Sequence, residues 1–433
     1  MLRRILRKLV LLTAVLLVAI AVLAIVIIER EPAVPAFSAP TPDDVEKART
    51  FVRNVRSAIN PDNEQSVTLV SNEDQLRAVA KLGTRTIPGV RSEFHFQGNK
   101  AIGIASAPIP FTNNSLWINL HAAAPEFEGE FKLSELKLGP ISLPPGAALK
   151  IGRVAANLVV GNQFGDTVLS AATKMKIDGD AVEFELSMGE MGTNGMMRGV
   201  FGALRGSEMP GPAEIERYYT QIRQAMDNGT LPNEGSYLPY LQFTLQAAHE
   251  GGAREGIENA YTSAILALAR VCGARDFTLI VGGLFEDTFD NTDNWNTDCS
   301  QLTLNDRIDS RRHFTTAAAI QAASNRGFSV SVGEFKELYD TLRSGGFDFT
   351  DIAANNSGIR MSDTLMATTI ENWPKKLASI TNENSLIVSY DNIPQIMSGE
   401  EFERIYTDVN SEAYLTMIAQ IENKISKISL HAE

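Results

Sequence analysis

The sequence is poor in the side chains and short patterns that usually mark a catalytic or metal centre. Its 433 residues include only two cysteines and five histidines. It contains no G-x-S-x-G, no H-E-x-x-H, no phosphate-binding loop and no dinucleotide-binding fingerprint. The sequence therefore gives no direct sign of a serine hydrolase, a zinc peptidase or a nucleotide-binding enzyme, and it identifies no cofactor.

Positive charge is also scarce. Lysine and arginine together number 39 against 52 acidic residues, which gives a formal net charge of −13. The first eight residues already hold four of the positive charges, so the rest of the chain is still more acidic. This balance argues against a nucleic-acid partner and against direct docking of the folded part on an anionic membrane face.

Polar side chains are almost absent from residues 9–28, which read LVLLTAVLLVAIAVLAIVII. About 20 apolar residues are enough for one helix to cross a bilayer. The basic residues before this run predict a cytoplasmic N-terminus, with the bulk of the chain in the periplasm of a bacterium: Arg3, Arg4, Arg7 and Lys8. We therefore expect a single-pass inner-membrane anchor. The alternative is a signal peptide cleaved near Ala19–Ala21.

The remaining pattern predicts an α+β ectodomain with an antiparallel sheet, followed by a mostly α-helical domain. Segments between about residue 89 and residue 188 alternate or run apolar with period two, whereas later segments repeat with helical spacing. The predicted boundaries are a tip and anchor over 1–28, a proline-rich linker over 29–42, an α+β domain over 43–188, a glycine- and methionine-rich linker over 189–206, and a helical domain over 207–433.

The two cysteines, Cys272 and Cys299, have no catalytic context and no zinc-site spacing. In an oxidising periplasm such an isolated pair is expected to form one disulfide. The alternative is two unpaired buried thiols. Between them lies an acidic loop with Asp287, Asp290, Asp293 and Asp298, which offers oxygen ligands for calcium but lacks the spacing and the glycine of an EF-hand.

Residues 311–358 predict three short helices joined by glycine-containing turns. The first runs over about 310–323 with His313 in its first turn, and the second over about 332–343 with Glu337 on it. Asp348 or Thr350 is expected to cap the third. In a first interpretation, His313, Glu337 and Asp351 form a divalent-metal or acid–base site. In a second, they cap helices and pair with neighbouring basic residues.

The same stretch resembles the VanZ-like family and related bacterial envelope proteins of undefined activity. The matching pieces are His313-Phe314, Glu337, Gly346-Phe347-Asp348-Phe349 and Asp351-Ile352-Ala353-Ala354-Asn355 with Gly358, within about 48 of the 433 residues. VanZ-like proteins carry this motif in membrane-spanning helices, whereas AAAIQAASN is too short to span a bilayer. The N-terminal domain resembles membrane-anchored lipid-binding domains of bacterial envelopes.

These patterns and resemblances together imply a periplasmic factor in envelope assembly or maintenance that binds a protein or lipid partner. The alternative is an envelope-directed hydrolase or metal-dependent enzyme that uses His313, Glu337 and Asp351. A cleft that brings these side chains within bonding distance would favour the enzyme.

Overall fold

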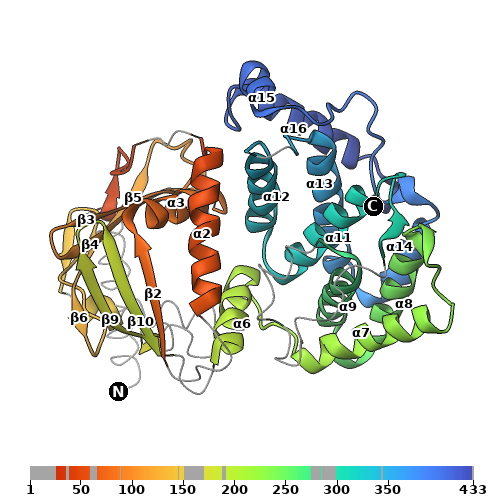
Figure 1. The fold of residues 1–433 in the computed structure, drawn as a ribbon, viewed down its shortest axis with the longest axis horizontal. Helices are drawn as coiled ribbons and strands as arrows, with labels where there is room; N and C mark the ends of the chain where they lie inside the picture. Colours follow the sequence, from red (N-terminus) through yellow and green to blue (C-terminus); the bar gives the residue numbers. More distant parts are fainter. Residues whose placement is uncertain are drawn as a thin grey trace, which may run out of the picture.

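A computed structural model describes residues 26–35, 39–58, 66–87, 89–144, 146–150, 170–187, 192–274, 284, 299–342 and 345–431. The earlier part of the chain forms antiparallel sheets with two helices, and the later part is helical, as the sequence predicts. In Figure 1 the sheets and the helices α2 and α3 stand on one side, and the later helices fill the other side.

Two antiparallel sheets make up the strand-rich part. The larger sheet has the order β3-β4-β5-β7-β8, with β1 added beside β5, and the smaller has the order β2-β10-β9-β6. The strands are β1 (Ile28–Glu29), β2 (Ser66–Asn72), β3 (Arg91–Gln97), β4 (Lys100–Pro108), β5 (Trp117–Pro125), β6 (Phe127–Glu128), β7 (Glu135–Leu138), β8 (Ile141–Leu143), β9 (Ala172–Asp178) and β10 (Ala181–Ser187).

Two helices lie on these sheets and face the helical part. They are α2 (Pro42–Ala58) and α3 (Glu73–Arg85). Strand β2 leads directly into α3, because Asn72 accepts a hydrogen bond from the Gln75 amide and the Gln75 side chain reaches back to the Asn72 amide. The capping box therefore uses Asn72 and Gln75, although Ser71 and Asp74, one residue earlier, have the same spacing in the sequence.

The helical part contains three of the predicted helices in its first half and the predicted three-helix stretch in its second. Its elements are α6 (Gly192–Arg205), α7 (Pro212–Asp227), β11 (Glu234–Ser236), α8 (Leu238–Glu255), α9 (Ile257–Cys272), β12 (Gln301–Thr303), α11 (Ile308–Ala323), α12 (Arg326–Asp340), α13 (Phe349–Met366), α14 (Trp373–Ser379), α15 (Gly399–Tyr406) and α16 (Glu412–Ile425), with short 3₁₀ turns at Ile370–Asn372, Glu383–Ser385 and Ser429–His431.

Neither predicted linker is a free connector where the structure describes it. In the proline-rich segment 29–42, Glu29 belongs to β1, and the Val34 amide donates to Ser106 Oγ at 3.0 Å. Val34 itself is 0% exposed. The segment 189–206 forms α6 over most of its length, and Phe201 anchors that helix in the core. Proline content suggested a linker over 29–42 and glycine content suggested one over 189–206, but apolar contacts with the folded part decide the structure of both.

Three predicted features cannot be placed. The anchor over residues 9–28 lies almost entirely outside the described residues, as does the acidic loop before Cys299. The same holds for most of residues 144–161, PPGAALKIGRVAANLVVG, which the proline at their start predicts to be a helix. Within the parts of the chain that the structure describes, no helix combines the length and the apolar character needed to cross a membrane. The first described strand, β1, begins at Ile28, where the predicted anchor ends.

A single large core joins α2 and α3 to the later helices. The Arg49 guanidinium of α2 lies over the Tyr339 ring of α12 at 4.3 Å from its centre. At Gly327, a Cβ atom would come within 1.9 Å of the Thr86 carbonyl oxygen, so α12 can approach the end of α3 this closely only with glycine there. The two parts therefore meet through close backbone contact rather than through a flexible hinge of polar residues.

Candidate functional site

The motif residues lie on three helices that pack against one another: α11, α12 and α13. The start of α13 is fixed by Asp348, whose side chain accepts the Thr350 amide at 2.8 Å, as the sequence predicts. The turn before it requires Gly346, which has a φ of +71° and lies against the Met397 carbonyl. Helix α12 starts six residues earlier than predicted, because Asn325 caps it by accepting the Phe328 amide.

His313 of α11 is held between two oxygen atoms of α13. Its Nε2 lies 3.0 Å from Asp351 Oδ2, and its Nδ1 lies 3.1 Å from Asn355 Oδ1. The ring is only 5% exposed. Because both ring nitrogens face acceptors, the doubly protonated imidazolium satisfies both contacts, and the carboxylate of Asp351 balances its charge.

Glu337 of α12 completes the group and is 1% exposed. Its Oε1 accepts a hydrogen bond from Lys336 Nζ at 3.1 Å, and its Oε2 accepts the Asp348 amide at 3.2 Å. Lys336 also pairs with Asp340 at 2.8 Å. We call His313, Lys336, Glu337 and Asp351 the buried ionic cluster. Each of its charged groups has a partner of opposite charge or a hydrogen-bond donor within the same three helices.

Burial and neighbouring charges shift the titration of this cluster. Burial raises the pKa of Glu337 to about 7, and the positive charges of His313 and Lys336 only partly offset it. Burial alone would lower the pKa of His313, but the negative charge of Asp351 outweighs it and the pKa lies above its usual value. For Asp351 the burial effect is likewise outweighed, by His313, and its pKa is lowered.

The three predicted site residues do come together. Within the described residues, one ligand atom each from His313, Glu337 and Asp351 lies within 4.8 Å of the other two, which is the spacing of a candidate metal site. The Lys336 ammonium group opposes such a site, because it already neutralises Glu337 and would repel a divalent cation. The cluster is therefore an ion-pair network in which the positive charges of His313 and Lys336 balance the negative charges of Asp351 and Glu337.

Beside this cluster the molecule is hollowed by a cleft of about 1010 Å³. Its walls come from the end of α3 and the loop after it, from α12 and α13, and from α16 with the turn before it. Trp117 and Arg91 of the larger sheet also line it. Apolar side chains from all these walls face the cavity, among them Ile87, Ile352, Leu415 and Ile418. This volume lies at the upper end of the range for small-molecule pockets.

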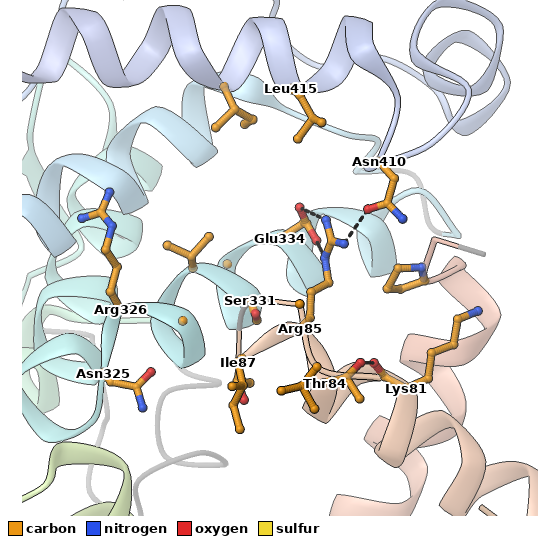
Figure 2. Close-up of a pocket in the computed structure, with 18 of the residues that line it drawn as sticks. Lys81, Thr84, Arg85, Ile87, Asn325, Arg326, Ser331, Glu334, Asn410 and Leu415 are labelled. Atoms are coloured by element: carbon orange, nitrogen blue, oxygen red, sulfur yellow. Dashed lines mark hydrogen bonds and ion pairs between the residues drawn. The ribbon is translucent and has the colours of Figure 1, made fainter. Parts of the chain in front are cut away.

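Positive charge exceeds negative charge on the cleft walls. Among the described residues that line the cleft, four are basic, namely Lys81, Arg85, Arg91 and Arg326, and one is acidic, Glu334. Figure 2 shows Arg85 in the middle of the cleft, joined to Glu334 and to Asn410. The Tyr414 hydroxyl also donates to Glu334 at 2.9 Å. The single carboxylate is therefore fully occupied by the protein itself.

Asn355 is the link between the cluster and the cleft. It lines the cavity and also accepts the hydrogen bond from His313, and its Nδ2 has no hydrogen-bond partner among the described residues. Gly333 of α12 lies against it, because a Cβ there would sit 2.7 Å from that nitrogen. His313, Glu337 and Asp351 themselves are not part of the cleft lining. They do not face each other across a cleft but lie in the packing behind its wall.

The predicted disulfide is confirmed, since Cys272 at the end of α9 is bonded to Cys299. Both sulfur-bearing side chains are fully buried, and the Arg311 guanidinium donates to the Cys299 carbonyl. The cleft, in contrast, was not predicted. Its residues come from segments far apart in the sequence, and no short motif joins Arg91 and Trp117 to Leu415.

Comparison of the chain with protein-family models, with curated proteins and with solved structures finds no match. The site is therefore interpreted from its own geometry.

Proposed function

We propose that this protein is a non-enzymatic, inner-membrane-anchored factor of the bacterial envelope that binds a lipid in the cleft. The observation that carries the proposal is the cleft itself: an open cavity of about 1010 Å³ with apolar walls and an excess of basic side chains. The resemblance to VanZ-like proteins and the periplasmic location stay predictions that agree with this role.

A lipid fits the position of the cleft better than a protein partner does. Trp117, which lines the cleft, pairs across the sheet with Glu29 of β1. That strand follows directly on the predicted membrane anchor. In a chain anchored there, the cleft wall at Trp117 lies next to the strand that leads out of the bilayer. A lipid would then reach the cavity without crossing the aqueous compartment.

The test is calorimetric titration of the full-length chain with lysophosphatidylcholine below its micelle concentration. The chain is kept in amphipol, so that no detergent competes for the cleft. We expect binding by the wild type and a loss of about tenfold or more in the variant Leu415→Asp, which places a charge on the apolar wall. Leu415 is 53% exposed, so the substitution is compatible with folding.

The matched control is Leu342→Asp. Leu342 is 50% exposed and does not line the cleft. It should bind as the wild type does. No binding by any of the three proteins, or equal weakening in both variants, would overturn the proposal.

A second candidate is an envelope-directed, metal-dependent hydrolase. The convergence of His313, Glu337 and Asp351 within 4.8 Å favours it. In that case the three side chains would hold the ion, and Lys336 would have to release Glu337 first. Metal analysis of the purified chain, with and without added zinc or manganese, decides between the candidates. A stoichiometric ion that is lost in Glu337→Gln supports the hydrolase.

A further inference from the structure

Resting on the proposed function, we infer that Arg91, stacked on Trp117, is the subsite that binds the head group of the lipid, and that this head group is anionic. The shape of the cleft alone does not specify the charge of its ligand. That charge is indicated by the basic side chains that line the cavity and by which of them already pair with carboxylates of the protein.

Three of the four basic side chains in the lining are matched by carboxylates of the protein. Lys81 lies 2.7 Å from Asp44. Arg85 donates to Glu334 at 2.9 Å. Arg326 donates to Asp363 at 2.9 Å and to Glu422 at 3.1 Å. Their charges are largely neutralised before any ligand arrives, so they hold the walls together rather than select an anion.

Arg91 is different. Its guanidinium lies 4.6 Å from the centre of the Trp117 ring and donates one hydrogen bond, at 3.3 Å, to the Val34 carbonyl. Within the described parts of the chain, no carboxylate pairs with it. A guanidinium group has five N–H donors, so several remain to bind a phosphate or carboxylate in a bidentate manner.

Trp117 holds this arginine in place. The indole is 3% exposed, and its Nε1 donates to the Asn114 carbonyl at 2.9 Å. An aromatic ring beneath a guanidinium fixes its plane and leaves its edge available for an anion. The subsite is therefore preorganised, which reduces the entropic cost of binding.

The position of Arg91 also fits the polarity of a lipid. It belongs to β3 and lies over Trp117 of β5, so it is on the sheet side of the cleft, while the apolar residues Ile352, Leu415 and Ile418 belong to walls formed by α13 and α16. A bound lipid would place its charged group against the sheet and its chain between the helices. Because the whole protein carries a net charge of −13, the excess of positive charge in the cleft is a local feature and not a property of the whole surface.

The experiment compares lysophosphatidylglycerol, which is anionic, with lysophosphatidylcholine of the same chain, which has no net charge. The wild type should bind the anionic lipid about tenfold more tightly, since a charged hydrogen bond contributes about that factor. The preference should shrink at high salt. In Arg91→Gln the preference should disappear, because the affinity for lysophosphatidylglycerol falls further than the affinity for lysophosphatidylcholine, whose phosphate is already balanced by its own ammonium group.

Two further variants guard against a folding effect. Asn114→Asp leaves Arg91 in place but adds a negative charge at an exposed position that lines the cleft and contacts Trp117 through its carbonyl, and it should also remove the preference. Arg53→Gln makes the same charge change on the exposed surface of α2, outside the cleft, and should keep the preference. Equal affinity of the wild type for both lipids, or a preference that persists in Arg91→Gln, overturns this inference and leaves lipid binding intact. Absence of binding by either lipid overturns lipid binding as well.

Discussion

The buried ionic cluster and the cleft share helices α12 and α13, yet they use charge in different ways. In the cluster, His313 pairs with Asp351 and Lys336 pairs with Glu337 and Asp340. In the cleft, basic side chains outnumber acidic ones and Arg91 has no acidic partner among the described residues. Charges that satisfy one another stabilise a fold, whereas an excess charge at the edge of an apolar cavity is available to a ligand.

The largest expected effect comes from breaking the cluster. Asp351→Ala removes the counter-charge of a buried imidazolium, so we expect a loss of about 3–5 kcal/mol in the free energy of unfolding. Denaturation of the full-length chain in urea, followed by circular dichroism, measures it. Asp309→Ala is the control, because it also removes an aspartate carboxylate. Asp309, however, is exposed and contacts Arg312 only at 4.0 Å. A loss in Asp351→Ala no greater than in this control would show that the cluster does not stabilise the fold.

The disulfide is a second stabilising element that lies away from the cleft. Replacing Cys272 and Cys299 together by serine opens a loop closed across 27 positions and should cost about 3 kcal/mol of unfolding free energy. Affinity for lysophosphatidylcholine should stay the same, since neither cysteine lines the cavity. If affinity fell together with stability, the separation of a stabilising region from a binding region would be wrong.

The smallest expected effect is a change in pH dependence. Burial raises the pKa of Glu337 to about 7 from the usual 4.5, so the folded state holds this proton more tightly than the unfolded chain does. The resulting stabilisation is complete below pH 4.5 and is lost as the pH rises through 7. The pKa of His313 is also raised, so its contribution to stability is likewise lost as the pH rises above 6.5. The pKa of Asp351 is lowered, so its contribution is present above pH 3.8 and is lost only as the pH falls below that value.

Glu337→Gln isolates the contribution of one proton. Stability of the wild type should fall between pH 5 and pH 8, by at most about 1.4 kcal/mol per pH unit for this proton. The variant should show a shallower fall, because a glutamine cannot ionise. Urea denaturation at several pH values provides the comparison. Parallel curves for the two proteins would mean that Glu337 does not carry the proton.

The sequence was sufficient for features that depend on local patterns. Helical spacing predicted α2, α7, α8 and α9, and the cap at Asp348 and the disulfide were expected from residue type alone. The convergence of His313, Glu337 and Asp351 was expected in one interpretation, because three short packed helices bring their inner faces together. In the other interpretation Glu337 was expected to pair with a neighbouring basic residue, and the structure shows that this residue is Lys336. The three side chains therefore converge and are also paired within the protein.

The cleft could not be predicted, for a physical reason. Arg91 and Trp117 are on strands, Arg326 begins α12 and Leu415 belongs to α16, and only the packing of the two parts brings them together. Glycine misled the prediction at 189–206, where Phe201 is buried in the core and Leu204 packs against it. Long-range packing decides both cases, and it leaves no periodic signal in a single sequence.

We propose that the cleft binds the ligand and that the buried ionic cluster behind it supports the fold. The most direct measurement is the affinity for lysophosphatidylglycerol of two folded variants, Arg91→Gln and His313→Gln, together with their unfolding midpoints. We predict that Arg91→Gln loses about tenfold in affinity with an unchanged midpoint, and that His313→Gln unfolds earlier but binds normally while folded. Normal binding by folded Arg91→Gln, with binding abolished in folded His313→Gln, would contradict the account and place the function in the cluster.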